Sequence, residues 1–91
     1  MYKYATLYDY IEDNVYSDKK TKLAMTVRDS YYARFGFDSE SAKTAKLRFV
    51  KTDECDDIYE IVRNNIVHCY LLSGPTYTMM STDAEDWSMV G

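Results

Sequence analysis

The sequence predicts a small α+β domain with an N-terminal helix, a three-stranded antiparallel sheet, an acidic second helix and one or two short C-terminal elements. Apolar residues recur at helical spacing in residues 4–15 and 53–66. Between residues 21 and 51 they alternate with polar residues in three successive segments, which is typical of strands. A chain of 91 residues holds one hydrophobic core, so we expect a single domain over residues 1–91.

The composition is that of a folded chain. Hydrophobic residues make up 46% of the sequence and aromatic residues 15%, with 3 glycines and 1 proline, which excludes disordered and low-complexity classes. No apolar run approaches the about 18 residues of a membrane span, and the first residues lack the pattern of a signal peptide. We therefore expect a soluble, cytoplasmic protein with no membrane partner.

Residues 4–15 are predicted to form an amphipathic helix. Its apolar side chains follow a spacing of three and four residues, and its acidic side chains fall on the opposite face. The apolar set is Tyr4, Leu7, Tyr8, Ile11 and Val15, and the acidic set is Asp9, Glu12 and Asp13.

Residues 21–51 fit two structures. The alternating segments are residues 22–28, 31–37 and 45–49, and three antiparallel strands explain all of them. A helix explains part of the same region, because Leu23, Ala24, Val27, Tyr31 and Phe35 form a helical stripe that Gly36 can terminate. A helix over residues 39–51 would place Lys46 in the apolar stripe and leave Leu47 outside it. We favour the strands, and a small all-α domain is the alternative.

The acidic second helix is predicted from residue 53 onwards. Its apolar face holds Cys55, Ile58, Ile61, Val62 and Ile66, and Thr52 or Asp53 can cap its first turn. The helical pattern fails after Asn64 and Asn65, so residues 66–72 form either a buried strand or a fully buried end of the helix. Residues 73–76 form a turn, residues 77–80 a short strand, and Trp87 anchors a polar tail.

Catalytic and metal-binding patterns are absent from the sequence. The two cysteines, Cys55 and Cys69, are too few for a disulfide framework, so we expect free thiols. His68 and Cys69 are an adjacent base and nucleophile, but neighbouring side chains point in different directions in a helix or a strand. With no paired metal-ligand spacing and no glycine-rich phosphate loop, we expect no enzymatic activity, no metal and no cofactor.

The net charge of −4 is unevenly distributed. Residues 19–51 hold nine of the 11 basic residues and only three of the 15 acidic ones. If this region forms strands, cations and an aromatic ring project from one side of the sheet, an arrangement that suits single-stranded nucleic acid. This basic set is Lys22, Arg28, Tyr32, Arg34, Lys46 and Arg48.

The acidic set of the predicted second helix is Asp53, Asp56, Asp57 and Glu60. A row of carboxylates suits a cationic groove, and the 10 tyrosines are typical of protein interfaces. The sequence therefore favours a non-catalytic protein-binding module, in its sharpest form an inhibitor of a nucleic-acid-handling protein. A nucleic-acid-binding module that uses the basic set and a small structural subunit are the alternatives.

Overall fold

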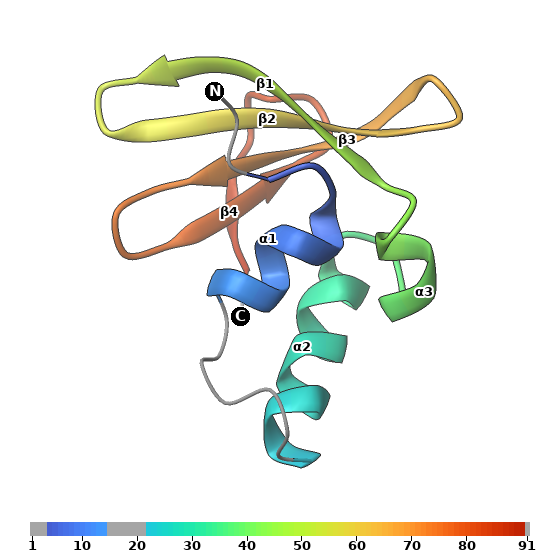
Figure 1. The fold of residues 1–91 in the computed structure, drawn as a ribbon. Helices are drawn as coiled ribbons and strands as arrows, with labels where there is room; N and C mark the ends of the chain where they lie inside the picture. Colours follow the sequence, from blue (N-terminus) through green and yellow to red (C-terminus); the bar gives the residue numbers. More distant parts are fainter. Residues whose placement is uncertain (1–3, 15–21, 91) are drawn as a thin grey trace.

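The computed structural model describes the backbone of residues 4–14 and 22–90 and the side chains of residues 4–14 and 27–90. Within these residues three helices lie beside one antiparallel sheet (Figure 1). The helices are α1 (Leu7–Asn14), α2 (Lys22–Arg34) and α3 (Ser39–Ala42). The strands are β1 (Lys46–Asp53), β2 (Asp56–Arg63), β3 (Ile66–Ser73), β4 (Thr78–Ser81) and β5 (Ser88–Met89), in sequence order across the sheet. The predicted α+β fold is confirmed, but the sheet has five strands in place of the three predicted.

Helix α1 forms where the apolar spacing predicts it. The Thr6 hydroxyl accepts a 3.1 Å hydrogen bond from the Asp9 backbone N–H and caps the first turn. Leu7, Tyr10 and Ile11 are buried. The helix starts three residues later than the predicted range of residues 4–15, and Val15 lies outside the described residues.

Helix α2 replaces the first two predicted strands, so the strand prediction for residues 22–37 is wrong and the helical alternative is right. Gly36 has a φ of +85° and closes the helix. Its N–H donates to the Ala33 carbonyl, and the Phe37 N–H donates to the Tyr32 carbonyl, both at 3.0 Å, which is the hydrogen-bond pattern of a Schellman motif. The helix is favoured over two strands because this cap satisfies the last carbonyl groups of the helix and because Tyr32 and Phe35 are buried in the core.

A short connection leads from α2 into the sheet. Asp38 caps α3, because its carboxylate accepts a 2.8 Å hydrogen bond from the Ser41 N–H, and this bond lowers the pKa of Asp38. Residues 46–49 of the strand predicted over residues 45–49 lie in β1, which extends to residue 53. The start of β1 also pairs with the residues before α1, since the Leu47 N–H donates to the Ala5 carbonyl at 3.0 Å.

The predicted acidic second helix does not form. Residues 53–66 instead turn at the end of β1, run through β2 and turn again into β3. The buried residues of β2 lie on both faces of the sheet, with Tyr59 and Ile61 on one face and Ile58 and Val62 on the other. Burial at positions 58, 59, 61 and 62 imitates helical spacing, which explains the wrong prediction. Residues 66–72 form the strand that the sequence left open, and the turn before residue 77 is present.

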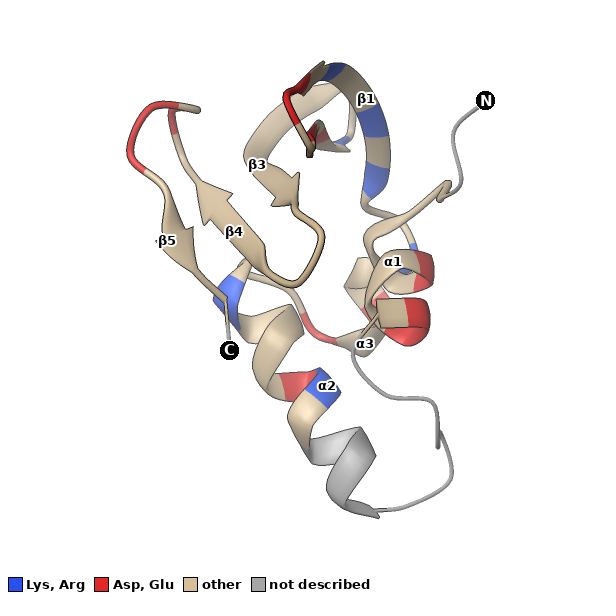
Figure 2. Ribbon diagram, turned by 90° about the vertical axis from the view of Figure 1, so that its left-hand side faces the viewer, with Lys and Arg blue, Asp and Glu red and all other residues tan. Residues whose placement is uncertain are grey.

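The two faces of the sheet have different surroundings. The core face packs against the helices and carries one cross-strand row in direct register, Phe49–Tyr59–Leu71–Met80–Ser88. We call the other side the open face, because all three helices contribute buried residues to the core side. Its corresponding row is Lys51–Ile58–Leu72–Met79–Met89. Figure 2 shows the helices together on one side of the curved sheet.

Candidate functional site

The β1–β2 hairpin concentrates carboxylates at one end of the sheet. Asp53 and Asp56 are direct cross-strand partners, and Glu54 and Cys55 form the turn between them. Asp57 follows on β2, where its carboxylate accepts a 2.7 Å hydrogen bond from the Thr52 hydroxyl. We call Asp53, Glu54, Asp56 and Asp57 the acidic tip.

The backbone of this turn is unusual for its residues. Glu54 has a φ of 57°, in the left-handed region that favours glycine and asparagine. The β2–β3 hairpin has a turn of the same length, and there Asn64 and Asn65 take φ values of 55° and 64°. Asparagine is typical of such turns, so the second hairpin follows local preference and the acidic tip departs from it.

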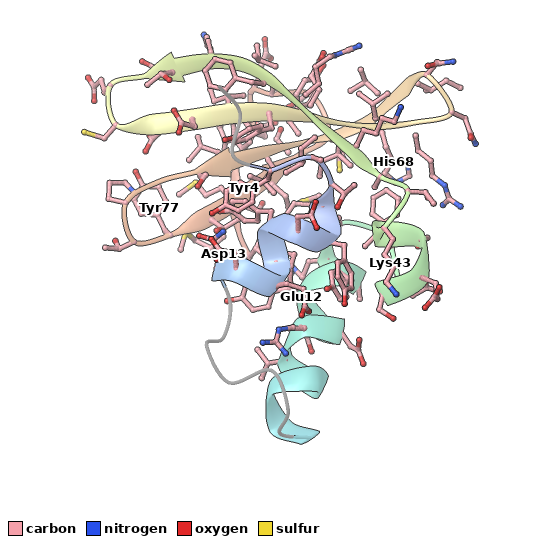
Figure 3. All side chains as sticks on the ribbon, in the orientation of Figure 1. Tyr4, Glu12, Asp13, Lys43, His68 and Tyr77 are labelled. Carbon is pink, nitrogen blue, oxygen red and sulfur yellow. The ribbon has the colours of Figure 1, made fainter. Side chains whose placement is uncertain are left out.

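Tyr77 connects the acidic tip to the neighbouring β3–β4 turn. Its hydroxyl donates a 2.6 Å hydrogen bond to Asp56, and this bond raises the pKa of Tyr77 above its ordinary value. Its ring lies directly against Gly74, where a Cβ atom would be 2.3 Å from the ring. Figure 3 places Tyr77 at this turn, at the same end of the sheet as the acidic tip of Figure 1.

A cavity of about 340 Å³ lies on the helix side of Tyr77, and its wall includes Tyr10, Tyr31 and Asn14. The buried Tyr10 hydroxyl is held by Thr78 at 2.8 Å and by Ser73 at 3.0 Å. Tyr10, Tyr31 and Tyr77 thus line one cavity, and of these three Tyr77 contacts the acidic tip.

The structure brings together three of the four residues in the acidic set. Asp53, Asp56 and Asp57 lie in the acidic tip, whereas Glu60 lies on the open face and accepts a 2.7 Å hydrogen bond from Arg48 Nε. The four are thus not one helical row: Asp57 lies on the face opposite Asp56, and Glu60 shares the face of Asp56 but lies four residues farther along the extended strand. Sequence reasoning missed Glu54 and Tyr77. The paired residues Asn64 and Asn65, where the helical pattern fails, are typical of a hairpin turn, and they were the signal that residues 56–73 form two strands.

The basic set does not form a face of the sheet. Arg28 and Tyr32 belong to α2 and are only 3% and 1% exposed. Arg28 Nε lies 3.2 Å from Glu12 Oε2, and the Tyr32 hydroxyl donates to the same oxygen at 3.2 Å. Burial, followed by the Glu12 charge, raises the pKa of Tyr32. Figure 3 shows Glu12 on α1 directed toward α2.

The remaining members of the basic set are separated. Arg34 donates a 2.8 Å hydrogen bond to the Met89 carbonyl, and the Lys22 side chain lies outside the described residues. Lys46 and Arg48 lie on β1, in rows of the open face. The predicted basic sheet face is therefore wrong as a grouping, because most of its members lie on a helix.

The cysteines and the histidine lie in unrelated environments. Cys55 and Cys69 are both free, as predicted; Cys55 is exposed at the tip and Cys69 is buried. Burial raises the pKa of Cys69 to about 11, and the His68 ring packs 4.8 Å from the Phe37 ring. Among the residues that the structure describes, no three His, Cys, Asp or Glu side chains are grouped to hold a metal ion. No helix in the described ranges is long and apolar enough to cross a membrane.

Comparison with known proteins gives no relative: no family model, no curated protein and no solved structure matches the chain.

Proposed function

We propose that the protein is a non-catalytic protein-binding module whose acidic tip docks on a cationic surface of a partner protein. The observation that supports this most directly is the cross-strand pair of Asp53 and Asp56. Like charges directly opposite each other in neighbouring strands repel and destabilise the sheet. Both residues lie at the end of a hairpin, away from the core cluster, and features that cost stability in this way are typical of functional sites.

The turn residue Glu54 supports the same proposal. Its left-handed backbone costs about 1 kcal/mol relative to glycine. Glu54 is exposed, and its carboxylate extends the negative charge of Asp53 and Asp56 beyond the end of the sheet. The Asp53–Asp56 pair and the left-handed Glu54 both cost stability, and both place negative charge on the same exposed hairpin.

The partner has a cationic surface because charge complementarity governs encounter with such a tip. Concentrated surface charge raises the association rate with an oppositely charged partner and makes that rate dependent on salt. Proteins that bind nucleic acid present lysine and arginine to phosphates, and carboxylates can occupy the same positions. Inhibition of a nucleic-acid-handling protein is therefore the specific form of this function that we favour.

Capture of partners from host lysate, with and without nuclease, tests the proposal. Asp53→Asn with Glu54→Gln removes two charges from the tip and retains the bonds of Asp56 and Asp57. Asp9→Asn with Glu40→Gln removes two exposed charges from the helices and serves as the matched control. We expect the wild type and the control to retain a protein partner after nuclease treatment, and the tip variant to associate more slowly and with less salt dependence.

Two results would overturn the proposal. A tip variant that binds the captured protein with wild-type kinetics would show that the acidic tip is only solvated. A partner that is lost on nuclease treatment would favour the alternative in which this protein binds nucleic acid, with Lys46 and Arg48 as the basic-set members that lie on the sheet.

A further inference from the structure

The open face carries an apolar row that extends from β2 to β5. Ile58, Leu72, Met79 and Met89 stand in direct register on β2, β3, β4 and β5. Ile58 and Leu72 are each 8% exposed, Met79 is half-buried and Met89 is 53% exposed. Apolar exposure thus increases from the middle of the sheet toward β5, and no helix of the described ranges covers this side.

Opposite charges border this row at the two margins of the sheet. At the β1 margin, three of the four open-face rows begin with a cation, namely Lys46, Arg48 and Lys51, and the fourth begins with Asp53. At the other margin, the loop between β4 and β5 carries Asp83, Glu85 and Asp86. Figure 2 shows the basic bands of β1 at one margin and the acidic loop at the other.

Hydrogen bonds fix the conformation of the acidic loop. The Asp83 carboxylate accepts backbone N–H bonds from Glu85 at 2.9 Å and from Asp86 at 3.0 Å, and a third bond from the Ser81 hydroxyl at 2.9 Å. These bonds lower the pKa of Asp83 and keep its charge at the margin. Glu85 and Asp86 are exposed beside it.

We propose that the open face is a homodimer interface and that its occupant is a second copy of this chain. A two-fold axis parallel to the strands, lying between two facing sheets, places the β1 margin of one protomer over the β5 margin of its partner. Lysines of each protomer then meet the acidic loop of the other, and Met89 is covered by the apolar row of the facing copy. Face-to-face packing of antiparallel sheets with nearly aligned strands is a common arrangement, and such a contact closes on itself.

Charge selects this axis over the other simple one. A two-fold axis perpendicular to the strands would stack β1 on β1, and the basic margin of one copy would not meet the acidic loop of the other. The axis parallel to the strands also leaves both acidic tips at the same end of the dimer. Asp53 and Asp56 of the acidic tip lie at the end of the same face, but none of the residues changed in the test below belongs to the tip, so the test does not depend on the proposed function.

Sedimentation velocity and light scattering on the nuclease-treated full chain test the proposal, with two charge-reversal variants. The strand variant is Lys46→Glu with Lys51→Glu, and the loop variant is Glu85→Lys with Asp86→Lys; the Arg48–Glu60 bond and Asp83 are unchanged in both. We expect the wild type to dimerise and each variant alone to be monomeric, because its margins repel. Mixing the two variants restores opposite charges at both contacts and should give a one-to-one heterodimer.

Lys43→Glu with Arg63→Glu makes the same charge change as the strand variant and should remain dimeric. Lys43 directly follows α3, and Arg63 lies on the helix side beside Phe37. Circular dichroism of each variant establishes that it is folded. A wild type that stays monomeric up to about 1 mM would overturn the proposal. Variants that dimerise like the wild type, a mixture that stays monomeric or a control that dissociates would each overturn it as well.

Discussion

The phenolic hydroxyl of Tyr77 donates a 2.6 Å hydrogen bond to Asp56 and joins the β3–β4 turn to the acidic tip. The ring reaches this position because Gly74 has no side chain beneath it. A carboxylate held in this way loses less conformational entropy when it meets a partner. Tyr77 is therefore a positioning residue for the acidic tip.

Tyr77→Phe should loosen the acidic tip while the ring remains in place. The variant removes the hydrogen bond to Asp56, so we expect faster amide exchange at residues 54–56 and a small decrease in the thermal midpoint. Gly74→Ala should have a similar effect, because its Cβ would displace the Tyr77 ring. Exchange measured by NMR or mass spectrometry checks this, and wild-type exchange rates in both variants would contradict the positioning role.

Glu54→Gly should stabilise the protein and weaken partner binding. Glycine adopts the φ of 57° at this turn without the penalty of a Cβ, and the change removes one negative charge beside the opposed carboxylates of Asp53 and Asp56. We expect the free energy of unfolding to rise by about 1 kcal/mol, as measured with urea. Asn65→Gly at the other hairpin is the control and should change stability less, because asparagine already tolerates this backbone. Lower stability in Glu54→Gly would show that the glutamate has a structural role.

Replacing Glu12 alone should destabilise the protein more than replacing both members of the Glu12–Arg28 ion pair. Arg28 is 3% exposed, so Glu12→Gln leaves its charge without the facing carboxylate and should cost about 2 to 3 kcal/mol. Adding Arg28→Met to Glu12→Gln removes the buried charge and should restore part of this loss. Urea unfolding of the two single variants and the double variant measures the coupling. Strictly additive losses would mean that the two residues do not depend on each other.

Stability should decline at high pH partly through Tyr32. Burial and Glu12 raise the pKa of Tyr32 above the ordinary 10.0, so the folded protein retains the phenol proton where the unfolded chain releases it. The contribution is complete below the unfolded pKa and is lost as the pH rises toward the folded pKa. Tyr32→Phe should therefore lose stability with a shallower slope above about pH 10. An equal slope in both proteins would contradict this assignment.

The two thiols should react at different rates. Cys55 is exposed, whereas Cys69 is buried and its pKa is raised to about 11. Alkylation of the native protein without reductant should therefore label Cys55 alone, and alkylation in denaturant should add a second label. Intact mass measures both. Two labels on the native protein would show that β3 opens readily, and no label in denaturant would indicate a disulfide.

The sequence by itself determined the elements whose signals are local. The three- and four-residue spacing around Leu7 and Ile11 predicts α1, and alternation around Leu47 predicts β1, because one face of each element is buried. The residues between 73 and 77 predict the turn before β4. Two cysteines in a chain of this kind predict free thiols, and both are free.

Only the tertiary structure decided the regions whose patterns fit two periods. In residues 22–37 both interpretations were available, and burial of Tyr32 and Phe35 together with the Gly36 cap selected the helix. In β2 the sheet buries Ile58 on one face and Tyr59 on the other, so the strand has no polar face for the sequence to reveal.

The grouping of residues at the candidate site also depends on how the strands pair in the sheet. Asp53, Asp56 and Asp57 are close in sequence, and any local structure keeps them near one another. Tyr77 reaches Asp56 only because β2 and β3 are neighbours in the sheet. Glu60 leaves the group because an extended strand carries it four residues along β2 from Asp56, on the same face. Composition therefore determined that this chain carries concentrated negative charge, and strand register determined which carboxylates act together.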